Sequence, residues 1–167
     1  LAAVNQKMVE LTWNIADGVI FYLRPKNEIK STLARMQNEK KIDTTLQIIT
    51  CVNEDSEKAM TRAKKTLAFY ISVGKIYRKF LASNGFENET KNIFEEYEKN
   101  GLQNNHELVP DSMVNELCIA GTSDECRIQL KQFRETGIDL PIIQFNPTDN
   151  VEDSFNLVTT TFSEESD

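Results

Sequence analysis

Short apolar segments alternate with amphipathic helical patterns along this chain, and no other sequence feature restricts the fold as strongly. The last unit is the clearest. Gly121–Glu125 begins a helical pattern that stops at Gly137, and residues 138–145 then form an apolar run typical of a buried strand. Thr122 or Ser123 can cap this helix, because short hydroxyl side chains accept hydrogen bonds from the first free backbone N–H groups. A helix followed directly by a buried strand predicts an α/β fold with parallel strands.

The same alternation extends back to the start of the chain. Apolar and β-branched runs predict the end of one strand at Leu1–Val4 and further strands at Val19–Leu23, Thr44–Val52 and Leu117–Ala120. Helical patterns connect them at residues 8–16, 27–40, 57–72, 75–82, 87–100, 112–116, 126–136 and 151–161. Several strands are apolar on both faces, which suits a closed barrel or a doubly wound sheet.

The spacing of apolar residues also predicts which helical side chains enter the core. In the first helix these are Met8, Leu11, Trp13 and Ile15. In the helix at residues 126–136 they are Ile128, Leu130 and Phe133.

Composition and charge argue against several classes of function. The chain has 167 residues, enough for one domain with a core, and a formal net charge of -7. An acidic balance argues against nucleic-acid binding, which needs a basic face. No apolar run reaches the roughly 20 residues of a membrane helix, and no signal peptide is visible. We therefore expect a cytoplasmic protein with neither nucleic acid nor a membrane as its partner.

Three cysteines, Cys51, Cys118 and Cys126, have no metal-binding spacing. We expect buried free thiols, a reducing compartment and no metal site. The nucleotide-binding signatures Gly-x-Gly-x-x-Gly and Gly-x-x-x-x-Gly-Lys-Ser/Thr are absent from the sequence. The chain begins Leu1-Ala2-Ala3 without an initiator methionine, so we expect it to be a piece of a longer protein.

Several short motifs occur in an order that is similar to that of a known family. They are Asp17-Gly18-Val19-Ile20, Ile48-Ile49-Thr50-Cys51-Val52 with Asn53-Glu54-Asp55, Lys65-Thr66-Leu67-Ala68-Phe69-Tyr70, Leu108-Val109-Pro110-Asp111, Ala120-Gly121-Thr122-Ser123-Asp124-Glu125 and Gly137-Ile138-Asp139-Leu140-Pro141. Over about residues 1–147 their order and spacing resemble the bacterial luciferase-like superfamily. Within it, the chain most resembles the coenzyme F420-dependent enzymes, which include methylenetetrahydromethanopterin reductase.

The resemblance implies a (β/α)8 TIM barrel of about twice this length. The chain would be its C-terminal half, from the end of the fifth strand to the last helix, over residues 1–162 with a helical insertion at about 85–116 before the last strand. Residues 163–167 would form an acidic tail. The missing N-terminal half of the barrel is then the expected partner, and the intact enzyme is expected to form a homo-oligomer.

The resemblance also implies a cofactor-binding loop at Ala2, Ala3, Val4, Asn5 and Gln6. In the family this loop follows the fifth strand, typically reads Ala-Ala-x-Gly-Pro-Lys, and approaches the phosphate-bearing tail of the cofactor through backbone N–H groups. Asn5 and Gln6 stand where glycine and proline are more usual. Asparagine tolerates a left-handed backbone, so we expect the turn to be kept. The alternative is an ordinary turn between a strand and a helix.

Tyr22 and Arg24 end the next strand, and the ends of barrel strands carry function. We expect both to contact a small-molecule substrate, because an arginine there can bind a carboxylate or phosphate through two hydrogen bonds. The alternative for Arg24 is a surface side chain beside Pro25. His106 lies in a polar loop without a sequence partner and is not expected to be catalytic. The sequence names no catalytic residue.

The function implied by the resemblance is hydride transfer between coenzyme F420 and a small organic or pterin substrate, with the cofactor supplying the chemistry. One alternative keeps the fold but uses FMN and oxygen, as luciferase-like monooxygenases do. Another alternative is a non-catalytic half-barrel that serves as an interaction module. The chain alone is expected to be inactive and to leave an apolar lumen side uncovered, formed by Val19, Phe21, Ile48 and Ile143.

Overall fold

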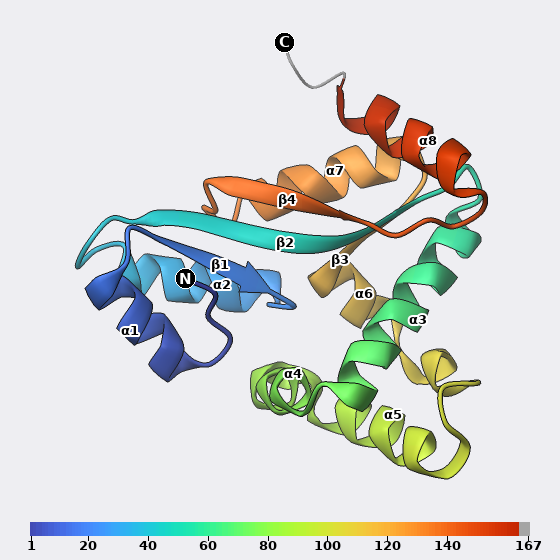
Figure 1. The fold of residues 1–167 in the computed structure, drawn as a ribbon, viewed down its shortest axis with the longest axis horizontal. Coiled ribbons are helices and arrows are strands. Elements are labelled where there is room, and N and C mark those ends of the chain that lie inside the picture. Colours follow the sequence, from blue (N-terminus) through green and yellow to red (C-terminus); the bar gives the residue numbers. More distant parts are fainter. Residues whose placement is uncertain (164–167) are drawn as a thin grey trace.

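The computed structural model describes residues 1–163 as a parallel four-stranded sheet with helices around it (Figure 1). The strands are β1 (Gly18–Tyr22), β2 (Asp43–Val52), β3 (Cys118–Gly121) and β4 (Leu140–Phe145). The α-helices are α1 (Gln6–Ile15), α2 (Lys26–Met36), α3 (Ser56–Val73), α4 (Lys75–Leu81), α5 (Glu87–Asn100), α6 (Asp111–Leu117), α7 (Ser123–Arg134) and α8 (Val151–Ser163). A π-helical turn, η1 (Ala82–Phe86), joins α4 to α5, and a 3-10 turn, η2 (Asn105–Leu108), precedes α6.

β2 is the long central strand of the sheet. Residues 45–47 pair with both β1 and β4, and residues 49–50 pair with both β3 and β4. Because a strand has only two edges, β4 occupies one edge of β2, and β1 and β3 share the other. At the outer edge of β1, Ala2 forms a single parallel bridge with Ile20. The strand end predicted at the start of the chain is therefore present as one bridge.

Helices α1, α2, α7 and α8 cover one face of the sheet and form a hydrophobic core with it. Val19, Phe21 and Ile48 belong to this core and are at most 1% exposed, and Trp13 stacks on Phe21 with ring centroids 6.3 Å apart. The prediction that Val19, Phe21, Ile48 and Ile143 line an uncovered lumen is wrong, because these side chains face the helices. Side chains alternate along a strand, so an error of one position exchanges the two faces.

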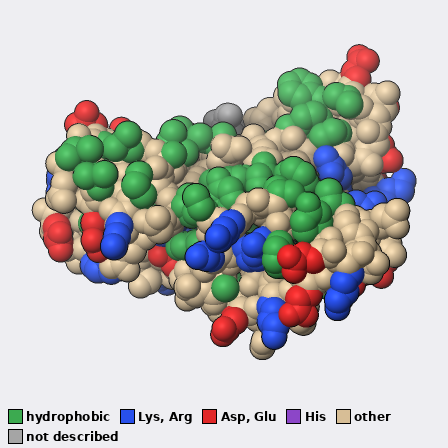
Figure 2. All heavy atoms as spheres, turned by 60° about the horizontal axis from the view of Figure 1, so that its bottom comes forward, with side chains coloured by type: hydrophobic (Ala, Val, Ile, Leu, Met, Phe, Trp, Pro, Cys, Tyr) green, Lys and Arg blue, Asp and Glu red, His purple; other side chains and the backbone are tan. Residues whose placement is uncertain are grey.

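The opposite face of the sheet is the one that a barrel would turn toward its lumen. Ile20, Leu140 and Ile142 lie on this lumen face, in register with Thr45 and Gln47 of β2. They are 45%, 57% and 37% exposed, so β4 is not the fully buried strand that its apolar run predicted. Figure 2 shows hydrophobic side chains gathered across the middle of one face of the molecule. The sheet thus has an uncovered apolar lumen side, but it is formed by Ile20, Leu140 and Ile142 and not by the four residues that were predicted.

Helices α3 to α6 lie between β2 and β3 in the chain and pack over the carboxyl end of the lumen face. There, Ile49 and Cys51 of β2 share a second hydrophobic core with Ala59 and Ala63 of α3. The domain boundaries drawn from the sequence stay a prediction. The predicted acidic tail lies outside the described residues, apart from Ser163.

Helix α1 turns a different side to the core than the spacing predicted. The buried residues are Val9, Thr12 and Trp13, whereas Met8, Leu11 and Ile15 are exposed. Thr12 can be buried because its hydroxyl donates to the Met8 carbonyl oxygen at 2.7 Å. Trp13 can be buried because its indole N–H donates to the carbonyl oxygen of Lys40 at 3.0 Å. The core position that the spacing assigned to an apolar residue is thus taken by Thr12, whose hydroxyl forms its hydrogen bond within the helix.

Helix α7 begins with the cap that the sequence predicts. The Thr122 side chain accepts from the Glu125 backbone, and the Glu125 carboxylate accepts from the Thr122 N–H at 2.8 Å, which completes a capping box. Leu130 and Phe133 are buried as predicted, but Ile128 is 60% exposed, so its core assignment is wrong.

The three cysteines are free and buried, as predicted. In residues 1–163, no helix has the length and apolar character needed to cross a membrane. Within the same residues, no group of histidine, cysteine and acidic side chains is arranged to hold a metal ion.

Candidate functional site

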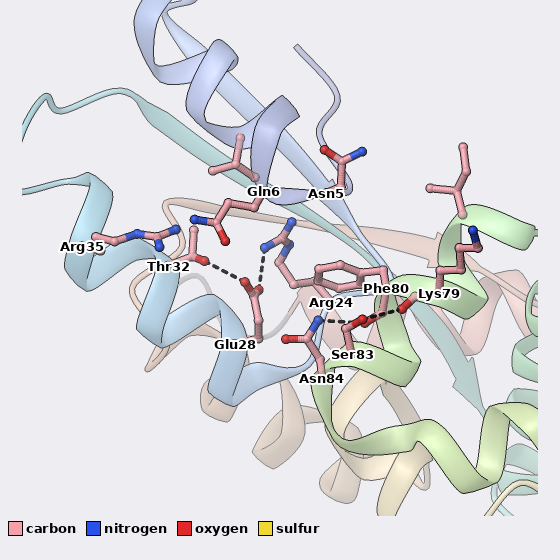
Figure 3. A pocket seen from close by; sticks show the side chains of 12 residues that line it. Asn5, Gln6, Arg24, Glu28, Thr32, Arg35, Lys79, Phe80, Ser83 and Asn84 are labelled. Atoms are coloured by element: carbon pink, nitrogen blue, oxygen red, sulfur yellow. Dashed lines mark hydrogen bonds and ion pairs between the residues drawn. The ribbon is translucent and has the colours of Figure 1, made fainter.

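A cleft of about 470 Å³, the first cleft, lies between the start of α1, helix α2 and the α4–η1 segment (Figure 3). Its lining includes Asn5 and Gln6 at the start of α1, Arg24 just after β1, and Lys79 on α4. The structure therefore brings together three of the residues that the sequence assigned to cofactor or substrate binding. They come from the ends of neighbouring parallel strands, which meet at one edge of the sheet. Their binding roles stay predictions.

Arg24 is buried beside the first cleft, with 2% of its surface exposed. Its Nη1 donates to Glu28 Oε2 at 2.6 Å, and its Nη2 donates to the Val4 carbonyl oxygen at 2.6 Å. The rings of Phe21 and Phe80 lie 4.5 and 4.6 Å from the guanidinium carbon. Because Val4 belongs to the predicted cofactor loop and Phe80 belongs to α4, Arg24 connects the loop, the sheet and helix α4.

The alternative of Arg24 as a surface side chain is wrong, because the guanidinium is buried. Burial lowers the pKa of Arg24 from its ordinary value, and the Glu28 carboxylate opposes that shift. The predicted contact with a substrate anion stays a prediction. Such an anion would have to displace Glu28 or Val4, or use the Nε of Arg24, which is buried and has no hydrogen-bond partner among the described residues.

The backbone between Tyr22 and Arg24 is unusual. Leu23 has a φ of 49°, in the left-handed region that bulky side chains rarely adopt, and its side chain is 2% exposed. In a regular strand, residues 22 and 24 would share a face, but here Arg24 lies over the ring of Phe21 on the helix-covered side. Strained backbone of this kind clusters at binding and catalytic sites. The turn at Leu23 thus separates the two predicted substrate residues.

Only part of the predicted cofactor loop borders the first cleft. Ala2 bridges to β1, and Ala3 is 1% exposed and belongs to the hydrophobic core. Asn5 has an extended backbone with a φ of -91° and caps α1 by accepting from the Met8 N–H at 3.0 Å. Asn5 therefore does not use the left-handed backbone that asparagine tolerates, and the turn is kept by capping. Cofactor binding by Ala2, Ala3 and Val4 stays a prediction.

The first cleft has the electrostatics of an anion site. Within residues 1–163, the N–H groups of Gln6 and Lys7 have no protein partner, as is usual in the first turn of a helix. Arg35 and Lys79 line opposite sides of the cleft in Figure 3, and neither forms an ion pair in the described part of the chain. The acidic residue in the lining, Glu28, is already paired. A helix N-terminus next to unpaired cations favours a negatively charged ligand.

Tyr22 lies on the lumen face and does not line the first cleft. Its ring meets Tyr70 edge-on at 5.2 Å and Tyr77 edge-on at 5.6 Å between centroids. Its hydroxyl is buried without a hydrogen-bond partner in residues 1–163. Burial raises the pKa of Tyr22, and the neighbouring Tyr70 hydroxyl adds to the shift. The predicted pair of substrate residues is thus divided between the two sides of β1.

A second cleft of about 400 Å³ lies between α3, the η2 segment and the end of β4. Arg62, Tyr70, His106 and Gln144 are among the residues that line it. Sequence reasoning missed this cleft, because its walls come from segments that are far apart in the chain. The available signal was Gln144 with Asn146, two polar residues at the end of an apolar strand.

Residues 1–140 match the model of a protein family described as luciferase-like monooxygenase. The chain belongs to this family. No curated protein sequence matches it. The luciferase-like resemblance read from the sequence is therefore confirmed.

Solved structures of similar fold include both F420-dependent and FMN-containing proteins. Coenzyme F420-dependent tetrahydromethanopterin reductase from Methanopyrus kandleri has a TM-score of 0.80 and 16% identity, over 99% of this chain and 50% of that chain. An F420-dependent secondary alcohol dehydrogenase in complex with an F420-acetone adduct has a TM-score of 0.65 and 15% identity, over 99% and 48%. Riboflavin lyase with modified FMN and riboflavin has a TM-score of 0.60 and 7% identity, over 98% and 41%.

At these identities the likeness shows the fold, and this chain spans about half the length of the solved structures that it matches. The predicted α/β half-barrel is therefore confirmed.

Proposed function

We propose that this chain forms part of a luciferase-like oxidoreductase that transfers hydride between coenzyme F420 and a small organic substrate. One observation carries the proposal. Among residues 1–163, the N–H groups of Gln6 and Lys7 at the start of α1 have no partner, and the cleft beside them also holds Arg35 and Lys79, which form no ion pair there. A phosphate-bearing cofactor tail fits this combination of backbone donors and positive charge.

The residues of the first cleft would hold the cofactor tail without taking part in the chemistry. Gln6 and Lys7 would donate from the backbone, and Lys79 would contribute its charge from α4. Arg24 would fix the loop by holding the Val4 carbonyl oxygen. When bound, F420 carries the hydride, and the protein supplies orientation and a shielded pocket.

The choice of F420 over FMN is supported by the fold comparisons, since two similar structures are F420-dependent enzymes. FMN is the rival cofactor, because riboflavin lyase also has this fold and also binds a phosphate-bearing ligand. A non-catalytic half-barrel is the third candidate, supported by the uncovered lumen face.

A spectroscopic titration separates these candidates, because F420 and FMN have distinct absorbance. The purified protein is titrated with each compound, alongside the variants Lys79→Gln and Lys131→Gln. Lys131 lies on α7, carries the same charge and does not line the first cleft. We expect saturable F420 binding that is at least tenfold weaker in Lys79→Gln and unchanged in Lys131→Gln.

Tighter binding of FMN than of F420 would favour the flavin-dependent rival. Binding of neither compound would contradict the proposal and leave the non-catalytic half-barrel. Equal affinities of Lys79→Gln and Lys131→Gln for F420 would show that the cofactor does not bind in the first cleft.

A further inference from the structure

The second cleft is separate from the first and is built from a different set of side chains. Arg62, Lys65 and Phe69 line it from α3, His106 lines it from η2, and Gln144 lines it from β4. Its volume of about 400 Å³ lies within the range of small-molecule sites, about 300–1,000 Å³. Tyr70, which packs on Tyr22, is also part of its wall, so the cleft continues the lumen face.

The charge of the second cleft is opposite to that of the whole chain. Among the residues that the structure describes, its lining includes Arg62 and Lys65 and no acidic residue, although the chain has a net charge of -7. Neither cation forms an ion pair within residues 1–163. A neighbouring groove shares Arg62 and Lys65 and is also lined by the carboxylates Glu57 and Asp149, of which Asp149 is paired with Lys58 at 3.7 Å. Two unpaired cations in a concave, acid-free site favour an anionic ligand.

Arg62 is held in place without using its full capacity as a donor. Its Nε donates to the Pro147 carbonyl oxygen at 3.0 Å, which leaves both Nη groups without a protein acceptor among the described residues. One turn along α3, the Thr66 hydroxyl donates to the Arg62 carbonyl oxygen at 3.1 Å and lies 3.4 Å from Asn146 Oδ1, at the same end of β4. A guanidinium held this way presents a planar pair of donors, which matches the two oxygens of a carboxylate or phosphate.

The other wall of the second cleft is aromatic. Phe69 is 44% exposed, and its ring lies 5.6 Å from that of Tyr70 in an edge-on arrangement. His106 adds a third ring, whose Nδ1 is buried without a hydrogen-bond partner in residues 1–163. Buried polar atoms of this kind normally have partners, so the ring retains unused hydrogen-bonding capacity. An exposed aromatic ring beside the held guanidinium of Arg62 suits a ligand that is both planar and negatively charged.

We infer that the second cleft binds a small organic anion in which a planar ring carries a carboxylate or phosphate, with Arg62 and Lys65 on the anion and Phe69 on the ring. This inference rests on the proposed function in one respect, that the ligand is the substrate of the F420-dependent reaction. The binding itself does not require a cofactor, so the two claims can fail separately.

The test is an NMR titration of the purified protein, without cofactor, using phenyl phosphate, benzoate and benzyl alcohol as probes. We expect phenyl phosphate, benzoate or both to bind at least tenfold more tightly than benzyl alcohol. The better of the two anions identifies the anionic group. The double variant Arg62→Gln/Lys65→Gln should weaken anion binding at least tenfold. Lys64→Gln is the matched control, because Lys64 is on the same helix but pairs with Asp111 and does not line the cleft.

Two further variants locate the probe. Phe69→Ala should weaken phenyl phosphate binding more than binding of methyl phosphate, which has no ring. Lys79→Gln, in the first cleft, should leave the affinity for phenyl phosphate unchanged. The inference is overturned if benzyl alcohol binds as tightly as the anions, if Lys64→Gln matches the double variant, or if Lys79→Gln alone abolishes binding. None of these outcomes changes the result of the F420 titration, which tests the proposed function by itself.

Discussion

The ion pair between Arg24 and Glu28 gives the sharpest quantitative prediction, with Glu28→Gln as the perturbation. The glutamine keeps one oxygen that can accept from Arg24, and its NH2 group takes the place of the oxygen that accepts from Thr32 and can donate to that hydroxyl instead. The change therefore keeps the packing and a polar contact with each partner and removes the negative charge. Arg24 forms no other ion pair in residues 1–163 and is 2% exposed, so its charge would be left buried and uncompensated.

Breaking a fully buried ion pair from one side costs about 3–5 kcal/mol. Glu28 is 19% exposed, so water reaches part of the site, and the retained hydrogen bonds offset part of the loss. We therefore expect Glu28→Gln to lower the free energy of unfolding by about 2–3 kcal/mol. In an Arg24→Met background the sign should change, because Glu28 is then the unpaired charge. There, Glu28→Gln should be neutral or stabilising.

The assay is urea unfolding of the wild type, both single variants and the double variant, at one protein concentration so that self-association does not differ between samples. The four free energies form a double-mutant cycle, and the coupling energy should be at least about 2 kcal/mol. Equal costs of Glu28→Gln in both backgrounds would refute the reasoning, because Arg24 and Glu28 would then act independently.

Three further predictions test the cofactor loop, the α7 cap and the thiols. Gln6→Glu should weaken F420 binding at least tenfold, because it adds a negative charge at the first cleft, and it should leave the urea unfolding midpoint unchanged. An unchanged affinity for F420 in the titration would show that Gln6 is not part of the binding site. The hydrogen bond from the Thr122 backbone lowers the pKa of Glu125, so its stabilisation is present above the ordinary glutamate pKa of about 4.3 and is lost as the pH falls through the lowered value. Glu125→Gln should therefore destabilise the protein at pH 7, and urea midpoints of variant and wild type should converge in acid; a constant difference at all pH values would count against the cap. Burial raises the pKa of Cys51 and Cys126 to about 12, so both should resist iodoacetamide at pH 8 until urea unfolds the chain, and mass spectrometry of labelled peptides reads this directly.

The order of the elements could be predicted from the sequence because it depends on local chemistry. The run from Thr44 to Val52 is rich in β-branched residues, and Thr122 with Glu125 forms a capping box, so neither needs information from elsewhere in the chain. The stop at Gly137 is of the same kind, since its φ of 94° favours glycine. Elements and caps that depend on only a few neighbouring residues are therefore present in the structure as predicted.

The faces of the elements could not be predicted with the same success, because they depend on what covers them. Phe21 and Ile20 are both apolar, and only the position of α1 and α2 decides that Phe21 is buried while Ile20 is 45% exposed. Thr12 is buried through a hydrogen bond within its own helix, which an apolar pattern does not register.

The site was partly predictable for a similar reason. The family pattern pointed to Asn5, Gln6 and Arg24, and these three line one cleft. The pattern could not reveal that Arg24 is engaged with Glu28, since that contact depends on the left-handed turn at Leu23. The second cleft joins α3 to the end of β4, and no local motif marks such a long-range contact.

The central claim is that the sheet is half of a barrel whose apolar lumen face is left open, and sedimentation velocity over a range of protein concentrations tests it most directly. We expect the purified chain to self-associate, because Ile20, Leu140 and Ile142 expose apolar surface and the outer edge of β4 has no partner strand in residues 1–163. Ile142→Lys should shift the distribution toward monomer, whereas Ile128→Lys, on the helix-covered side, should behave as the wild type. A monodisperse monomer at all concentrations, with cooperative unfolding, would contradict the claim and indicate a self-contained α/β fold.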